Sequence, residues 1–210
     1  MWRSGGRAVS PREVFGMASA DADKMLLDRL CRALHLCTYQ AVGPQNSWLF
    51  LNVKPAVVLH GRTYGIFFAD LLERHRFPAH RVVVEILEDS ILDEPQLAEA
   101  VGYYRGLGCL VAIDDFGCGH SNFERIWALS PDIVKLDRSI LVQATAKSKV
   151  RCVLPGLVSL LHEAVSLVVM EAIVTEDEAL IAMDADADFV QGCYFGRRRT
   201  RTVEIAKHAP

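Results

Sequence analysis

Short apolar segments alternate with amphipathic stretches along most of this 210-residue chain, and this alternation constrains the fold more than any other feature. The apolar segments have the length and the β-branched content of buried strands. The predicted strands are 48–53, 82–87, 109–114, 132–136, 166–171 and 187–191. Because helical stretches separate these strands, the pattern predicts a parallel sheet in an α/β fold.

Helices are predicted between the strands and before the first of them. They lie near 10–18, 22–36, 63–75, 92–107, 121–128, 147–164 and 175–183. The first start is marked by Ser10 as N-cap, Pro11 at the first helical position and Glu13 in a capping box. Since no Pro/Gly/Ser-rich linker divides the chain, we expect one domain over residues 1–210.

Composition and charge exclude several classes of protein. With 51% hydrophobic and 23% charged residues, the chain is typical of a soluble globular domain. A net charge of −3 gives no case for a nucleic-acid polymer as partner, although 197–199 and Arg201 form a local basic cluster. His162 and Glu163 interrupt the longest apolar stretch, so a membrane span is not expected. Several of the six cysteines lie in apolar runs, as buried thiols of a reduced, cytoplasmic protein would.

A polar residue stands at or near the carboxyl end of each predicted strand. These residues are Asn52, Glu85, Asp114, Lys135, Glu171 and Gln191. The carboxyl ends of parallel strands converge on one face, which is the catalytic face of β/α barrels. A single such residue is more often a satisfied polar group, but six in register favour a functional site.

Two adjacent carboxylates, Asp114 and Asp115, end one of these strands, and a glycine-rich turn follows. Burying an unpaired carboxylate costs several kcal/mol, so a cation is expected there. A divalent metal ion is one interpretation. In the alternative, Asp115 caps the turn and Asp114 pairs with a lysine. The motif alone favours neither.

The acidic residues suit a particular metal chemistry. Carboxylate oxygens of Glu85, Asp114 and Asp115, with the amide oxygen of Asn52, are ligands for Mg²⁺ or Mn²⁺ rather than zinc. Such ions can orient a phosphate and neutralise charge during its hydrolysis.

The remaining strand-end residues could assist that hydrolysis. Lys135 could polarise an attacking water, Glu171 could act as a base or a further ligand, and Gln191 could hydrogen-bond a ligand. Alternatively, Lys135 forms a salt bridge to Asp137 or Asp114, and Glu171 is the partner of a helix N-cap.

Several ordered motifs resemble those of EAL domains, over nearly the whole chain from Ser10 to Arg198. The matching segments are 51–53, 84–88, 112–121, 132–138, 169–172 and 189–195. The resemblance implies a TIM-like β/α barrel. It also implies a relationship to bacterial phosphodiesterases that hydrolyse cyclic di-GMP to linear pGpG with two Mg²⁺ or Mn²⁺ ions.

The resemblance also implies roles for individual residues. Asn52, Glu85, Asp114 and Asp115 would be metal ligands, Lys135 and Glu171 would activate water, Gln191 would lie near the substrate, and Glu88 would anchor the loop after Asp115.

The chain departs from the family pattern at its start. The strand with a Tyr-Gln-Pro-like segment and the strand with the Glu-Ala-Leu motif are both absent, and Trp2 aligns just after that motif. We therefore expect an incomplete barrel without its first two strands, whose open edge favours a homodimer or a protein partner. One fewer anionic ligand would weaken the metal site. Val174 also replaces an acidic residue, and Arg198 replaces a proline.

Three functions follow from this comparison. The first is a metal-dependent cyclic di-GMP phosphodiesterase. The second, which the missing glutamate favours, is a catalytically inactive cyclic di-GMP receptor or protein-interaction module in bacterial signalling. The third is a β/α barrel that acts on another phosphorylated metabolite, which the specificity of the motif set makes remote.

Overall fold

The fold was analysed in a computed structural model of the chain. It describes residues 2–4, 7–9, 11–18, 20–44, 46–53, 61–87, 94–118, 123–164, 166–195 and 202–204. Ser10 and Glu88, to which the sequence assigned a helix cap and a loop anchor, lie outside these ranges.

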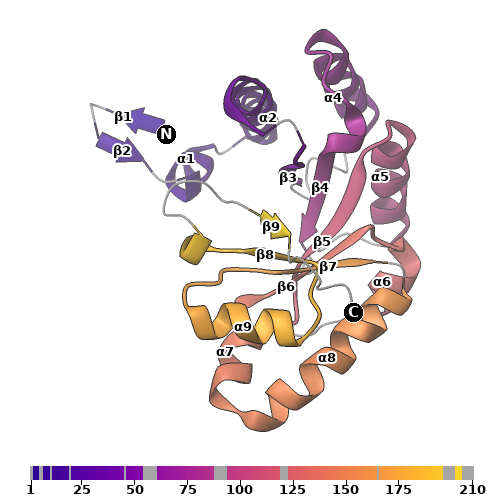
Figure 1. Ribbon diagram of the computed structural model, residues 1–210. Coiled ribbons are helices and arrows are strands. Elements are labelled where there is room, and N and C mark those ends of the chain that lie inside the picture. The colour runs from indigo at the N-terminus through magenta and orange to yellow at the C-terminus, as the bar shows by residue number, and fades with distance from the viewer. Residues whose placement is uncertain are drawn as a thin grey trace.

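Six parallel strands form a curled sheet at the centre of the molecule (Figure 1). They are β3 (Leu49–Val53), β4 (Val82–Leu87), β5 (Leu110–Phe116), β6 (Ile133–Leu136), β7 (Leu167–Met170) and β8 (Phe189–Gln191). They pair in chain order, and β9 (Thr202–Glu204) adds an antiparallel strand beside β8. In the described ranges, β3 and β9 are therefore the two ends of an open sheet, as expected for an incomplete barrel.

Helices cover the outer face of this sheet (Figure 1). They are α2 (Asp21–Val42), α4 (Gly61–Arg74), α5 (Glu94–Gly106), α6 (Phe123–Leu129), α7 (Arg138–Ala146), α8 (Ser148–Glu163) and α9 (Glu176–Asp184). Short 3-10 turns, η1 (Ala79–Arg81) and η2 (Cys193–Phe195), lie before β4 and after β8. Apart from the sheet lie α1 (Pro11–Met17) and an antiparallel pair of strands, β1 (Trp2–Ser4) and β2 (Arg7–Val9).

The alternation of the sequence predicted the parallel strands and their connecting helices correctly, and it missed three strands, one helix and the two 3-10 turns. The β1–β2 pair, α7 and β9 were not predicted, because segments of three to nine residues carry too little periodicity. Helix α2 also runs six residues beyond its predicted end, since no glycine or proline interrupts it before Gly43. Only Cys109 of the six cysteines is buried, and four are exposed.

Inside the curled sheet, alternate residues of the strands build two successive layers. The first layer is an apolar floor made of Phe50, Val83, Ala112, Ile133, Val169 and Phe189. The residue two positions further along each strand points to the same face. Those residues are Asn52, Glu85, Asp114, Lys135, Glu171 and Gln191. The pleat therefore places the predicted polar residues in one layer, directly above the floor.

The floor also brings the two sides of the parallel sheet together. The indole ring of Trp48, just before β3, lies 5.3 Å from the ring of Phe189 at the start of β8, centroid to centroid. Since β3 and β8 are the first and last parallel strands, this contact spans the inside of the curled sheet. Outward-facing strand residues pack against the helices in two further cores, one under α2 and α4 and the other under α5 to α9. Among the helices that the structure describes, none has the length and apolar character needed to cross a bilayer.

Two aspartate carboxylates accept hydrogen bonds from the backbone near the amino ends of strands. The carboxylate of Asp132, before β6, accepts the backbone N–H of Val111 on β5 at 2.8 Å. The carboxylate of Asp188, before β8, likewise accepts the N–H of Val168 on β7 at 2.8 Å. Arg105 lies 3.8 Å from Asp132 and adds an opposite charge. Both carboxylates thus satisfy strand N–H groups where each strand begins.

Replacing Asp132 with alanine tests the first of these hydrogen bonds. We expect Asp132→Ala to lower the free energy of unfolding by about 1–2 kcal/mol, because a charge-assisted hydrogen bond to a backbone donor is lost. Chemical denaturation would measure this loss, with an unchanged denaturant slope as the sign that the folded state is intact. Unaltered stability would mean that water replaces the carboxylate at no cost.

Candidate functional site

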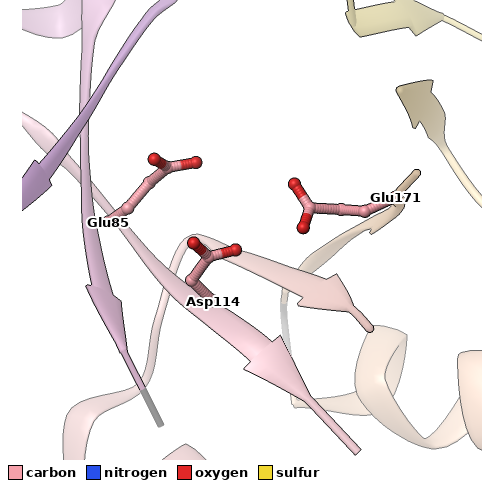
Figure 2. Close-up of side chains that lie close together, drawn as sticks. All are labelled: Glu85, Asp114 and Glu171. Carbon is pink, nitrogen blue, oxygen red and sulfur yellow. The ribbon is translucent and has the colours of Figure 1, made fainter. Parts of the chain in front are cut away.

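Four side chains from four parallel strands meet at the carboxyl ends of the sheet. Glu85 on β4, Asp114 on β5 and Glu171 directly after β7 turn their carboxylates toward one another (Figure 2). One oxygen from each carboxylate lies within 4.8 Å of the others. The ammonium of Lys135 on β6 donates hydrogen bonds to Glu85, to Asp114 at 2.9 Å and to Glu171. We call these four residues the acidic cluster.

The acidic cluster is buried and carries more negative than positive charge. Glu85, Asp114 and Lys135 are 5%, 7% and 3% exposed. Three ionised carboxylates around one ammonium sum to a formal charge of −2, from −3 and +1. Burial raises the pKa of Glu171 to about 7 and also raises that of Glu85, although Lys135 opposes both shifts. Burial lowers the pKa of Lys135, but the carboxylates outweigh it and hold that pKa above its ordinary value. Lys135 therefore stays protonated.

The excess negative charge and the donor atoms fit a hard divalent cation. Carboxylate oxygens are the ligands that Mg²⁺ and Mn²⁺ prefer. Within the part of the chain that the structure describes, this trio is the one group of acidic, histidine or cysteine side chains close enough to hold a metal ion. The ring centroid of Phe50, a residue of the floor, lies 5.6 Å from the Lys135 nitrogen, so the cluster rests directly on the floor. The floor therefore lies on the side of the cluster that faces the amino ends of the strands.

Two residues with left-handed backbones follow two of the carboxylates. Asp115 has φ of 59° after Asp114, and Ala172 has φ of 55° after Glu171. In both cases the next residue, Phe116 or Ile173, returns to the outer core. An extra residue has been inserted into the pleat, and the register shift on β5 is the corresponding bulge. The insertion keeps the carboxylate on the inner face while the residue after it packs in the outer core.

The structure brings five of the eight predicted site residues into contact, the acidic cluster and Asn52. The side-chain amide of Asn52 donates to Glu85 at 2.9 Å. Asp115 lies outside the trio of close carboxylates, but its charge contributes to the raised pKa of Glu85. Gln191 ends β8 at the same edge, where its backbone carbonyl accepts the N–H of Ile173 at 3.0 Å. Glu88 lies outside the described residues.

Of the alternatives that involve no metal, the structure contains the salt bridge between Lys135 and Asp114 but not the helix cap at Glu171. The pairing of Asp114 with a lysine is present, because Lys135 lies between the carboxylates. Asp137 is not its partner, since that carboxylate caps α7 by accepting the N–H of Ser139. Nor does Glu171 form the cap of α9, which consists of Thr175 and Glu178.

Comparison with known proteins identifies the family. The family model described as "EAL domain" matches residues 1–198. This chain belongs to the EAL domain family.

A curated relative of this EAL domain is much longer than the chain. Over 148 residues it is 25% identical to the cyclic di-GMP phosphodiesterase PdeF of Escherichia coli, a match that covers 70% of this chain and 20% of PdeF. The chain thus spans far less than half of that relative.

Solved structures share the fold. A Klebsiella pneumoniae BlrP1 structure, a complex with manganese and cyclic di-GMP, superposes with a TM-score of 0.81 at 22% identity, covering 92% of this chain and 48% of BlrP1. The FimX EAL domain of Pseudomonas aeruginosa bound to cyclic di-GMP gives 0.79 at 21% identity, covering 97% and 81%. At this identity, the two structures establish the β/α barrel architecture.

The net negative charge of the acidic cluster predicts that the stability of this EAL domain depends on pH when a chelator removes divalent cations. A carboxyl group whose pKa rises on folding stabilises the folded state at low pH, and this contribution is lost as the pH rises through the folded value. For Glu171 the loss should occur between pH 4.5 and about 7. We expect Glu171→Gln to stabilise the protein more at pH 8 than at pH 5. Denaturation in EDTA at both values would measure this, and an equal effect at both would contradict the assignment.

Removing the ammonium should make stability depend on a divalent cation. Lys135→Met leaves three buried carboxylates uncompensated, so we expect a loss of about 3–5 kcal/mol in EDTA. Mn²⁺ should restore part of this loss, since a cation bound by the folded state stabilises it. Thermal unfolding with and without Mn²⁺ would test this, and the same deficit under both conditions would argue against cation binding at the acidic cluster.

Proposed function

We propose that this EAL domain is a metal-dependent phosphodiesterase that hydrolyses cyclic di-GMP to linear pGpG. The observation that carries the proposal is the acidic cluster, in which Lys135 and three carboxylates converge at the carboxyl ends of the parallel strands. The names of relatives support the substrate, because PdeF is a cyclic di-GMP phosphodiesterase.

The chain's own residues would divide the reaction between them. The raised pKa of Lys135 keeps it a cation and hydrogen-bond donor, so it orients the phosphate and the attacking water rather than accepting a proton. Glu171, whose carboxylate pairs with the same ammonium, is the group placed to accept the proton of that water. The water oxygen bonds to phosphorus, the bond from phosphorus to the 3′ oxygen breaks, and the 3′ oxygen takes up a proton.

The metal would be held by the acidic cluster. Oxygens of Glu85, Asp114 and Glu171 would bind Mg²⁺ or Mn²⁺, and Asn52 and Asp115 lie beside them. A bound divalent cation supplies positive charge that neutralises the phosphate as it reacts. Gln191 would contact the substrate, and Glu88 would anchor the loop after Asp115.

A second candidate function is a cyclic di-GMP receptor without turnover. The separation of Asp115 from the close trio favours it, because the described residues then offer one compact cation site rather than two. Phosphate hydrolysis by a pair of ions requires both to be held. A homodimer or a protein partner at the ends of the sheet stays a prediction for either function.

Calorimetric titration of cyclic di-GMP in Ca²⁺, followed by product analysis in Mg²⁺ or Mn²⁺, separates these functions. We expect binding and metal-dependent pGpG formation, and we expect Glu85→Gln and Lys135→Met to slow it by at least about 100-fold. Asp132→Ala, at the opposite end of the sheet, is the control for lost stability. Binding without pGpG would establish the receptor, and no binding by a folded protein would reject both functions.

A further inference from the structure

Glu178 on α9 is a buried carboxylate that the proposed reaction does not use. It is 6% exposed, although it belongs to the helix that follows the loop 171–175. Its carboxylate accepts the N–H of Val174 at 2.7 Å and that of Thr175 at 3.2 Å. In return, the Thr175 hydroxyl accepts the N–H of Glu178 at 3.2 Å. The bond to Val174 exceeds what a capping box requires, so Glu178 holds the loop as well as the helix.

The loop that Glu178 holds contains Glu171, and the residue after it, Ala172, has a strained backbone conformation. Ala172 adopts a φ of 55°, in the left-handed region that a residue with a Cβ rarely occupies. On the sheet side, two backbone hydrogen bonds hold the loop. The N–H of Glu171 donates to the carbonyl of Leu136, and the N–H of Ile173 donates to that of Gln191. Gly192 packs so closely that an added Cβ would lie 2.0 Å from the Ile173 carbonyl oxygen. On the helix side, Glu178 satisfies the two N–H groups that follow.

A second element joins the same carboxylate. Arg138, at the start of α7, lies 3.8 Å from the other oxygen of Glu178. Arg138 comes three residues after Lys135, so Glu178 connects the chain that follows β6 with the chain that follows β7. These two strands supply Lys135 and Glu171, which bond to each other in the acidic cluster.

We propose that Glu178 is a positioning residue, which keeps Ala172 left-handed and thereby holds the Glu171 carboxylate in the acidic cluster. Without Glu178, Val174 and Thr175 lose their acceptor, Ala172 relaxes toward an ordinary backbone conformation, and Glu171 moves away from Lys135. The inference rests on the proposed function only in that Glu171 is taken as part of its cation site.

The test compares Glu178→Ala with Glu178→Gln and with a matched control. Asp132→Ala is the control, because Asp132 also accepts a backbone N–H and also lies 3.8 Å from an arginine, but at the opposite end of the sheet. Glu178→Gln keeps an acceptor oxygen for the loop. The two readouts are Mn²⁺ affinity by calorimetry and amide hydrogen exchange in EDTA.

We expect Glu178→Ala to weaken Mn²⁺ binding by about 10-fold, as substitutions behind metal ligands do. Glu178→Gln should lie within about threefold of the original protein and Asp132→Ala within about twofold, since neither releases the loop. In EDTA, Glu178→Ala should also speed exchange at the amides of Glu171 and Ile173. Faster exchange confined to Val174 and Thr175 would overturn the proposal, because the loop would then be held without Glu178.

Ala172→Gly provides the second arm. Glycine adopts positive φ without a Cβ clash, so adding it to Glu178→Ala should recover part of the lost affinity and slow the exchange at Glu171. Strictly additive effects would show that Glu178 does not act through Ala172. If the unsubstituted protein binds no Mn²⁺, the proposed function fails, and hydrogen exchange still decides the role of Glu178.

Discussion

The bonds between one ammonium and three carboxylates inside the sheet are the interaction on which the rest of the site depends. Charges this deeply buried are stable only when they are paired, and Lys135 pairs Glu85, Asp114 and Glu171 at once. The pairing is incomplete by two charges, which explains why burial raises the pKa of Glu171 and Glu85 despite the adjacent lysine. The same four side chains therefore pair their buried charges inside the sheet and form the candidate functional site.

The strand pleat explains why those side chains meet. Each polar residue stands two positions after a floor residue, so Ala112 leads to Asp114 and Ile133 to Lys135 on the same inner face. At Asp115 and Ala172 a left-handed residue is added, so that the next residue packs in the outer core while the preceding carboxylate stays on the inner face. The regular pleat of the strands thus builds the polar layer, and the left-handed residues Asp115 and Ala172 follow two of its carboxylates.

Sequence reasoning predicted the parallel sheet and the layer of polar strand ends, because both follow from local periodicity and strand direction. It did not predict that Asp115 would lie outside the close trio, since the bulge that displaces it is a tertiary feature. The role of Glu178 was also missed, although Thr175 and Glu178 have the spacing of a capping box. That pattern predicts a helix start, but not the added bond to Val174, which depends on how the loop folds back.

The charge excess also connects stability with function. With no divalent cation present, the acidic cluster opposes folding above neutral pH, because burial disfavours its remaining negative charge. A divalent cation would cancel the formal charge of −2, so cation binding and folding would stabilise each other. The strained turn at Ala172 belongs to the same balance, since it holds the Glu171 carboxylate within 4.8 Å of the other two. In the proposed function, a cation bound by the three carboxylates would offset that repulsion, so the strained turn would serve the cation site rather than the stability of the fold.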